Sequence, residues 1–194
     1  RRSSLAVSQL TALPNLLTLA RIVLIPPVVG LLFVWQDWAR WVVLLLFVAA
    51  SVTDWLDGKL AREQGLVSPL GRFLDPIADK LLVAAVLVML AAVGQLRGLE
   101  VVAVILILSR ELLVSGLREY LGPFNVTVPV SALAKWKTTV QMVALTVLII
   151  APAWGRFWHG LGVGLLWLAV LLTLLTGWSY LRIGLRHMGV GKAP

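Results

Sequence analysis

Six long apolar runs, separated by short polar stretches, follow one another along the chain. A helix needs roughly 20 apolar residues to cross the hydrocarbon core of a bilayer, and a series of such runs is typical of a polytopic helical membrane protein. We therefore predict an all-α protein with six transmembrane helices, preceded by a short N-terminal amphipathic segment at residues 3–13. The predicted spans cover residues 22–35 (with residues 14–21 leading into them), 41–62, 72–93, 101–120, 131–150 and 161–181.

Two of the connections between spans are recognised by their residues. Residues 63–71 contain Gly65, Pro69 and Gly71, which predict a loop. Residues 151–160 are rich in tryptophan, and we expect them to connect the last two spans at the membrane–water interface.

The composition indicates one membrane-embedded unit. The 194 residues are 60% hydrophobic, with a mean hydropathy of +0.95, which excludes an ordinary soluble domain. No linker, repeat or low-complexity segment interrupts the chain, so we expect a single domain over residues 1–194. The absence of cysteine excludes a disulfide framework and a thiolate metal site.

The net charge of +8 comes from basic residues scattered at the ends of the predicted helices. No basic stripe with exposed aromatic residues is present, so we expect anionic membrane lipids and phosphate substrates as partners, and no nucleic acid. With six spans, all Lys and Arg residues except Arg40, Arg97 and Arg156 fall on the side of the two termini. The positive-inside rule makes that side cytoplasmic.

Four of the nine acidic residues are aspartates within residues 51–80, between two apolar runs. A carboxylate near hydrocarbon is costly unless it is paired, solvated or metal-bound. The first two are three residues apart and the last two are four apart, so each pair shares one face of a helix. If the two helices face each other, the carboxylates converge and repel unless cations bind, and an all-oxygen site suits Mg²⁺ or Mn²⁺. These residues are Asp54, Asp57, Asp75 and Asp79.

Small and basic residues accompany the first aspartate pair on the cytoplasmic side. Gly58 and Ala61 lie on or beside its face, where they leave room for a ligand or for close helix approach. Arg62 adds a cation that suits a phosphate.

The start of the first span has one polar face, formed by Asn15, Thr18 and Arg21 at helical spacing. Two interpretations fit this pattern. The residues either cap the helix and extend to the membrane surface, or form an edge that faces a ligand. On spacing alone we favour the first interpretation.

A second group of cations follows in the fourth and fifth spans. Arg110 comes directly after an apolar run and would be costly if it faced lipid. A phosphate-bearing second substrate would give Arg110, Arg118 and Lys135 a common purpose. Glu111 or Glu119 would pair with an arginine and hold its orientation. The alternative is positive-inside anchoring with internal salt bridges. Both interpretations fit Lys137 equally well, because it lies well off the face of Lys135.

The segment from Asp54 to Asp79 reads Asp-x-x-Asp-Gly-x-x-Ala-Arg-(x8)-Gly-x-x-x-Asp-x-x-x-Asp. This pattern resembles the signature of the CDP-alcohol phosphotransferase family without departure. Further motifs look like those of the bacterial phosphatidylglycerophosphate synthases within it. They lie at residues 14–21, 109–111, 115–120 and 135–142.

The resemblance implies a metal-dependent phosphatidyltransferase of the bacterial inner membrane, usually a homodimer, with a polar cavity open to the cytoplasm. It implies CDP-diacylglycerol as donor, glycerol 3-phosphate as acceptor, and phosphatidylglycerophosphate and CMP as products. It further implies that Asp54, Asp57 and Asp75 bind a two-metal centre, with Asp79 as a further ligand and the general base. The residues it implies for the cytidine diphosphate site are Asn15, Thr18, Gly58, Ala61, Arg62, Ser68 and Gly71.

Two other kinds of function fit parts of the sequence. A sister enzyme would use inositol phosphate or phosphatidylglycerol as acceptor, because Arg110, Arg118 and Lys135 suit any phosphorylated acceptor. A divalent-cation transporter would also place carboxylates at helix ends, but the acidic residues cluster at one membrane face and mark no route across. A non-catalytic scaffold explains none of the aspartate spacing.

Overall fold

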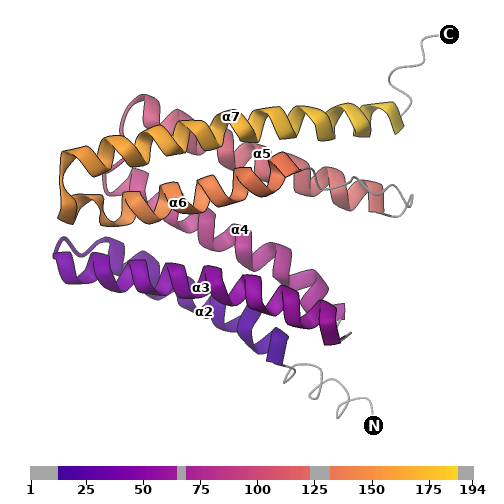
Figure 1. Ribbon diagram of the computed structural model, residues 1–194, viewed down its shortest axis with the longest axis horizontal. Coiled ribbons are helices and arrows are strands. Elements are labelled where there is room, and N and C mark those ends of the chain that lie inside the picture. The colour runs from indigo at the N-terminus through magenta and orange to yellow at the C-terminus, as the bar shows by residue number, and fades with distance from the viewer. Residues whose placement is uncertain (1–12, 65–68, 123–131, 188–194) are drawn as a thin grey trace. The chain divides into compact units, whose positions relative to one another are not determined.

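The computed structural model describes residues 13–64, 69–122 and 132–187, and its side-chain description leaves out residues 13–15, 54–64, 69–73, 75, 183 and 186–187. The described residues form six helices and no strand (Figure 1), which confirms the predicted all-α fold for this part of the chain. The predicted amphipathic segment, apart from Leu13, lies outside the described residues. The helices are α2 (Leu13–Leu32), α3 (Asp37–Gln64), α4 (Pro69–Ala92), α5 (Leu99–Leu121), α6 (Ala132–Trp154) and α7 (Arg156–His187).

The predicted loop at residues 63–71 was too long. Helix α3 continues through Gln64 and α4 begins at Pro69, so Gly71 lies inside a helix. Proline suits the first position of a helix, because the N–H that it lacks would have no partner there. The preceding Ala-Arg-Glu-Gln residues are good helix formers, which extends α3.

The predicted connection at residues 151–160 is also shorter than expected. Helix α6 runs to Trp154 and α7 begins at Arg156, so the chain reverses at Gly155, whose φ is 98°. Glycine adopts this left-handed conformation without the steric cost of a Cβ. Trp154 and Trp158 pack on either side of the turn, with ring centroids 4.7 Å apart. The tryptophans therefore cluster at the turn, but as parts of two helices.

Helix α4 ends at a glycine in the left-handed backbone conformation. Gly94 has φ 69°, its N–H donates to Ala91 O at 3.0 Å, and Gln95 N–H donates to Leu90 O at 2.9 Å. This pair of bonds is the Schellman arrangement, which satisfies carbonyls that the end of a helix leaves without partners.

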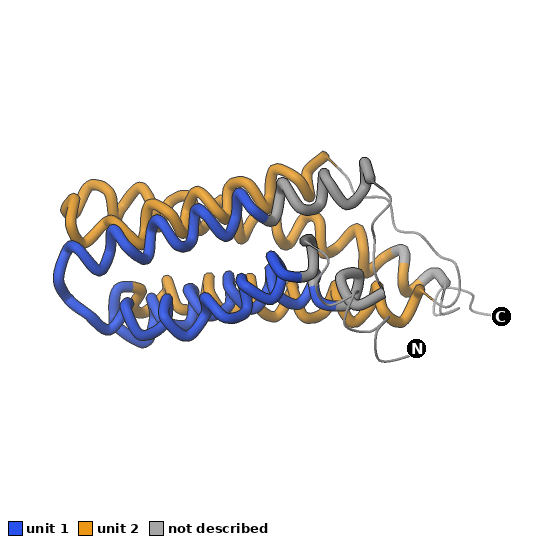
Figure 2. The backbone as a smooth tube through the Cα atoms, turned by 90° about the horizontal axis from the view of Figure 1, so that it is seen from below, with its two compact units in different colours: residues 1–95 blue, residues 96–194 orange. Residues whose placement is uncertain are grey.

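The chain divides into two compact units, Arg1–Gln95 and Leu96–Pro194 (Figure 2). In the first unit α2 packs against both α3 and α4. In the second unit α7 packs against both α5 and α6. Each unit thus has one helix in contact with the other two. Fully buried residues of the first unit include Val28, Phe47, Ala78 and Leu87, and those of the second include Ile107, Leu145, Leu148 and Leu166.

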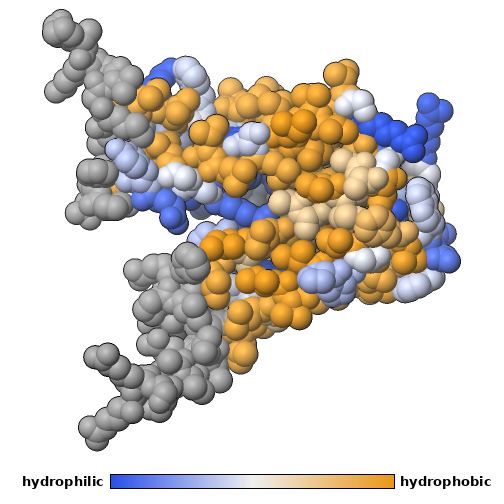
Figure 3. Space-filling model, turned by 180° about the vertical axis from the view of Figure 1, so that it is seen from behind, coloured by the Kyte–Doolittle hydropathy of each residue, from blue (hydrophilic) through white to orange (hydrophobic). Residues whose placement is uncertain are grey.

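Apolar side chains also cover much of the described surface (Figure 3). On α7, for example, Leu171, Leu175 and Trp178 are exposed. Such an exposed apolar surface is costly in water and suits a hydrocarbon environment.

Two of the described helices are long and apolar enough to cross a membrane, Ala132–Trp154 and Arg156–Arg182. Leu16–Leu32 is apolar but shorter. Helices α3, α4 and α5 carry charged residues within their length, which lowers their hydropathy. The count of six spans therefore stays a prediction.

Replacing Gly155 with alanine tests the turn between α6 and α7. No atom lies within 4 Å of the added methyl group, so the expected destabilisation comes from the backbone alone and amounts to about 1–2 kcal/mol. Gly164→Ala on α7 also adds a methyl group in open space, but within a regular helix, and should stabilise by up to about 1 kcal/mol. Thermal unfolding in detergent measures both, and shifts of the same sign would contradict the role of Gly155.

Candidate active site

The aspartate motif is divided between the end of α3 and the beginning of α4. Asp54 and Asp57 lie in the last three turns of α3, and Asp75 and Asp79 in the first three turns of α4. Five residue steps separate Gln64 from Pro69, so the facing ends of the two helices are at most about 18 Å apart. The helical backbone preserves the spacing that the sequence predicted within each pair. Convergence of the four carboxylates stays a prediction, because the side chains of Asp54, Asp57 and Asp75 lie outside the description.

The remaining motif residues divide in the same way. The side chains of Asn15, Ala61, Arg62 and Ser68 lie outside the described set, as do the surroundings of Gly58 and Gly71. Asp79 is described: its side chain is half-buried on α4 and follows the fully buried Ala78. Among the described side chains, no group of three or more acidic residues or histidines is suited to a metal ion. The predicted metal ligands are mostly outside that set.

The polar face at the start of α2 is turned into the protein. Thr18 is fully buried and Arg21 is 2% exposed, and α2 packs against both helices that contain the aspartates. A snorkelling arginine keeps its charged group in water, so the interpretation that we favoured from spacing is wrong for Arg21. Burial of Thr18 and Arg21 is the arrangement expected of a face that belongs to an internal polar site.

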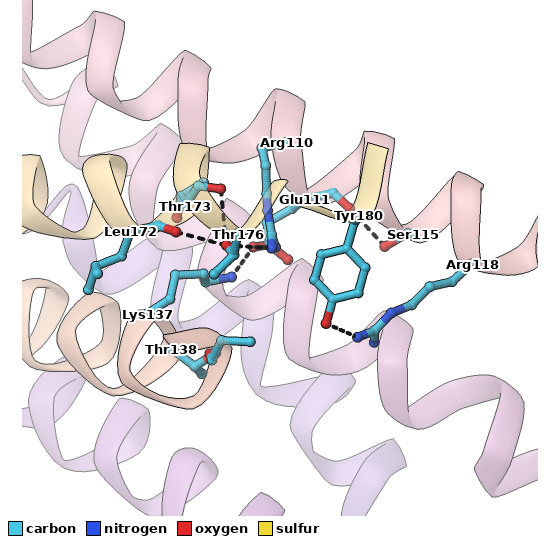
Figure 4. A network of polar contacts seen from close by, with 11 residues as sticks. Arg110, Glu111, Ser115, Arg118, Lys137, Thr138, Leu172, Thr173, Thr176 and Tyr180 are labelled. Atoms are coloured by element: carbon cyan, nitrogen blue, oxygen red, sulfur yellow. Dashed lines mark hydrogen bonds and ion pairs between the residues drawn. The ribbon is translucent and has the colours of Figure 1, made fainter. Parts of the chain in front are cut away.

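In the second unit, a buried ionic network joins all three helices (Figure 4). Glu111 Oε1 accepts a hydrogen bond from Arg110 Nη1 at 3.1 Å, and the same oxygen accepts one from Lys137 Nζ on α6. Arg110 Nη2 donates to Thr176 Oγ1 on α7 at 2.9 Å. The three charged side chains are between 7% and 17% exposed. The internal salt bridge that the sequence left as an alternative is therefore present.

Among the described ion pairs of this network, the carboxylate of Glu111 pairs with two cations, Arg110 and Lys137. Arg110 Nε, Gln141 Oε1 and Thr173 Oγ1 are buried and find no hydrogen-bond partner among the described residues. A buried polar atom without a hydrogen-bond partner is costly unless water or a ligand provides one.

Tyr180 of α7 brings the two predicted arginines of α5 together. Arg118 Nη2 donates to Tyr180 Oη at 2.9 Å, and the guanidinium carbon lies 5.0 Å from the ring centroid. The guanidinium carbon of Arg110 lies 5.8 Å from the same centroid. Since cations are attracted to the faces of aromatic rings, Tyr180 orients both groups on one side of α7 (Figure 4).

The two lysines of α6 occupy different environments. Lys137 is 6% exposed and paired with Glu111, whereas Lys135 is exposed. Residues two apart on a helix point to different faces, so only one of them reaches the network. The structure thus brings together Arg110, Arg118 and Lys137, and the phosphate-binding role predicted for Lys135 stays a prediction.

An apolar groove of about 910 Å³ runs between α5 and α7 beside this network. Leucines form most of its lining, and Arg110, Ser109 and Tyr120 contribute polar groups. Arg110 therefore belongs both to the ionic network and to the wall of an apolar groove, as expected where a polar group of an amphiphilic ligand meets its apolar part.

A family model described as CDP-alcohol phosphatidyltransferase matches residues 11–175. The chain belongs to this family. A relative from Rickettsia bellii is 46% identical over 172 residues, which cover 88% of this chain and 93% of the relative. A relative from Cereibacter sphaeroides is 37% identical, covering 91% and 97%, and one from Arabidopsis thaliana is 38% identical, covering 90% and 80%. The first two have the name CDP-diacylglycerol–glycerol-3-phosphate 3-phosphatidyltransferase, and the third has that name followed by the number 2.

The family match contains the four motif aspartates and the cations of α5 and α6, but it ends before two partners of those cations. Thr176 and Tyr180 follow residue 175 on α7, and sequence reasoning missed both. A signal was present, because Thr173, Thr176 and Tyr180 are polar residues at i, i+3 and i+7 of an otherwise apolar helix. Tyr180 and Thr176 are both buried.

Glu111→Gln tests the ionic network in this member of the family. The amide keeps the shape but removes the negative charge that pairs with Lys137 and Arg110, so stability should fall by roughly 3–5 kcal/mol. Adding Lys137→Met should restore part of the loss, because it removes one of the two cations that pair with Glu111. The exposed Glu119 on the same helix is the control, and Glu119→Gln should change stability by less than about 0.5 kcal/mol. Equal thermal shifts for the two single variants would contradict the network.

Proposed function

We propose that this chain transfers the phosphatidyl group of CDP-diacylglycerol to glycerol 3-phosphate, forming phosphatidylglycerophosphate and releasing CMP. The observation that carries the proposal is the agreement of relatives over nearly the whole chain. Proteins from bacteria and a plant that match 88–91% of it have the same activity name. The structure supports a phosphorylated acceptor, because Arg110 and Arg118 lie at the ring of one tyrosine and Arg110 also lines an apolar groove.

Asp54, Asp57, Asp75 and Asp79 would hold two divalent cations, Mg²⁺ or Mn²⁺. Four carboxylates from two consecutive helix ends form an all-oxygen donor set, which suits these ions. When bound, the ions neutralise charge on the pyrophosphate oxygens and on the departing CMP.

The donor nucleotide would lie along the same helix ends. The absence of large side chains at Gly58, Ala61 and Gly71 leaves room for the cytidine diphosphate, and Arg62 pairs with its phosphates. Asn15, Thr18 and Ser68 would provide hydrogen bonds. Support for this assignment comes from α2, whose polar residue Thr18 is buried in the unit that contains the aspartates.

The acceptor phosphate would be bound by Arg110, Arg118 and Lys135. The guanidinium groups of Arg110 and Arg118 are oriented around one tyrosine, and a phosphate bound there would hold the acceptor by its charged group. The hydroxyl oxygen attacks the phosphorus that bears diacylglycerol. A new P–O bond forms, the pyrophosphate P–O bond breaks, and CMP leaves with the electron pair.

Asp79 would take the proton of that hydroxyl as general base. A hydroxyl group is a poor nucleophile until its proton is removed, and a neighbouring carboxylate removes it in the transition state. Support for this role is that the Asp79 side chain is half-buried on α4, beside the fully buried Ala78.

The enzyme would be a multi-pass protein of the bacterial inner membrane, with six spans and its active site on the cytoplasmic side. The exposed apolar side chains of α5 and α7 support contact with membrane lipid. The distribution of Lys and Arg supports the orientation. The same resemblance that suggests the substrates suggests a homodimer.

The test of the function is CMP release from radiolabelled CDP-diacylglycerol by the purified protein, with a panel of acceptors. Glycerol 3-phosphate should support turnover, and glycerol should be slower by roughly 10⁴-fold, because the arginines would be left unpaired. EDTA should abolish turnover and Mg²⁺ or Mn²⁺ should restore it. Faster turnover with inositol phosphate or phosphatidylglycerol would show that the acceptor is wrong but the enzyme class is right. CMP release that is insensitive to EDTA would exclude the metal centre.

Asp79→Asn tests the general base. The amide cannot accept the proton, so turnover at saturating Mg²⁺ should fall by roughly 10²–10⁴-fold, while binding of CDP-diacylglycerol, followed by tryptophan fluorescence, should be largely retained. Asp37 in the first turn of α3 lies outside the motif and is exposed, so Asp37→Asn is the matched control and should leave turnover unchanged. Normal turnover of the Asp79 variant would remove this residue from catalysis.

A further inference from the structure

The side chain of Arg110 crosses α7 at a glycine. A Cβ atom added to Gly177 would lie 3.0 Å from Arg110 Cγ, 3.4 Å from Nε and 3.8 Å from Cδ. The first distance is shorter than an ordinary van der Waals contact, so any other residue at position 177 would displace this side chain. Gly177 therefore provides the space in which Arg110 lies against the backbone of α7.

The residue before it, Thr176, provides the hydrogen-bond acceptor. A threonine hydroxyl has one hydrogen to donate and two lone pairs. Thr176 Oγ1 donates to the backbone of its own helix, with Leu172 O at 2.8 Å, and accepts from Arg110 Nη2 at 2.9 Å. Because its hydrogen is used within α7, the hydroxyl presents a lone pair to Arg110. Thr176 is 2% exposed, so water does not compete for this position.

The guanidinium is thus fixed at two points. Glu111 binds Nη1 and Thr176 binds Nη2, and Lys137 in turn fixes Glu111. These two bonds use two of the five N–H groups of the guanidinium. Nε–H has no acceptor among the described residues. A planar group attached at two points keeps one orientation.

We propose that Thr176 and Gly177 are positioning residues for Arg110, which hold its guanidinium in the orientation that receives the phosphate of the acceptor. This inference rests on the proposed function, in which Arg110 binds that phosphate. Neither residue touches the acceptor. Thr176 acts through its hydrogen bond to Arg110, and Gly177 acts through the absence of a side chain beside it.

The alternative role is packing, in which both residues serve only to bring α5 and α7 together. The two roles predict different kinetics. A packing defect lowers the amount or stability of folded enzyme, and it does not change the KM of one substrate alone. A displaced Arg110 raises the KM for glycerol 3-phosphate and leaves that for CDP-diacylglycerol unchanged. KM does not depend on enzyme concentration. It therefore describes the folded molecules alone, even where the yield of folded protein is low.

The experiment measures both KM values for the purified full-length protein and its variants. Thr176→Val keeps the shape and removes the acceptor, and should raise the KM for glycerol 3-phosphate by about tenfold. Gly177→Ala displaces Arg110 by a few tenths of an ångström and should raise it by about threefold to tenfold. Thr176→Ser retains the hydroxyl and should behave as the unmodified protein.

Matched controls separate these effects from general changes in the helices. Gly164→Ala adds a methyl group on the same helix with no atom within 4 Å. Thr146→Val removes a half-buried hydroxyl that donates to Met142 O of its own helix. Neither control should change the KM for glycerol 3-phosphate by more than about twofold.

A double-mutant cycle decides whether the effect passes through Arg110. Arg110→Ala alone should raise the KM for glycerol 3-phosphate, and adding Thr176→Val or Gly177→Ala should then raise it no further. The same fold-increase in both backgrounds would overturn the inference, as would single variants with normal KM values while Arg110→Ala is impaired. An unchanged acceptor KM in Arg110→Ala itself would instead overturn the proposed role of Arg110, and with it the positioning role.

Discussion

A charge among apolar helices needs a counter-charge or a ligand, because neither lipid nor the protein interior solvates it. In the second unit, Glu111 is a counter-charge for two cations, Arg110 and Lys137. In the first unit, the proposed metal ions would be the counter-charge for the aspartate motif.

Each unit has one helix in contact with the other two, and in both units that helix contributes buried polar residues. Helix α2 has Thr18 and Arg21, and it packs on the helices that contain the aspartates. Helix α7 has Thr176 and Tyr180, and it packs on α5, whose arginines bind to them. In the second unit, the central helix thus supports charged groups that come from a neighbouring helix. The motifs in the sequence consist mainly of charged residues, so uncharged residues that support them, such as Thr176 and Tyr180, are easily missed.

The sequence predicted the helices well and their ends poorly. Long apolar runs decide where a helix lies, but Pro69 and Gly155 decide where one begins or the chain turns, and both were taken as parts of longer loops. Arg110 was recognised because a charge in an apolar helix is costly. The role of Lys137 stayed open, because spacing tells which residues share a face and not which neighbour that face meets. The ion pair with Glu111 shows one such neighbour.

The glycines of α7 show why contacts are needed to assign such residues. An added Cβ would meet the leucine side chains Leu148 at Gly162 and Leu117 at Gly184, so those glycines allow helices to pack closely. At Gly177 the nearest atoms belong to Arg110 instead. Identical residues on one helix therefore have different roles, which depend on what occupies the space beside them. Because the side chain beside Gly177 is a cation with two fixed hydrogen bonds, the space there determines the direction of a charge and not only the distance between helices.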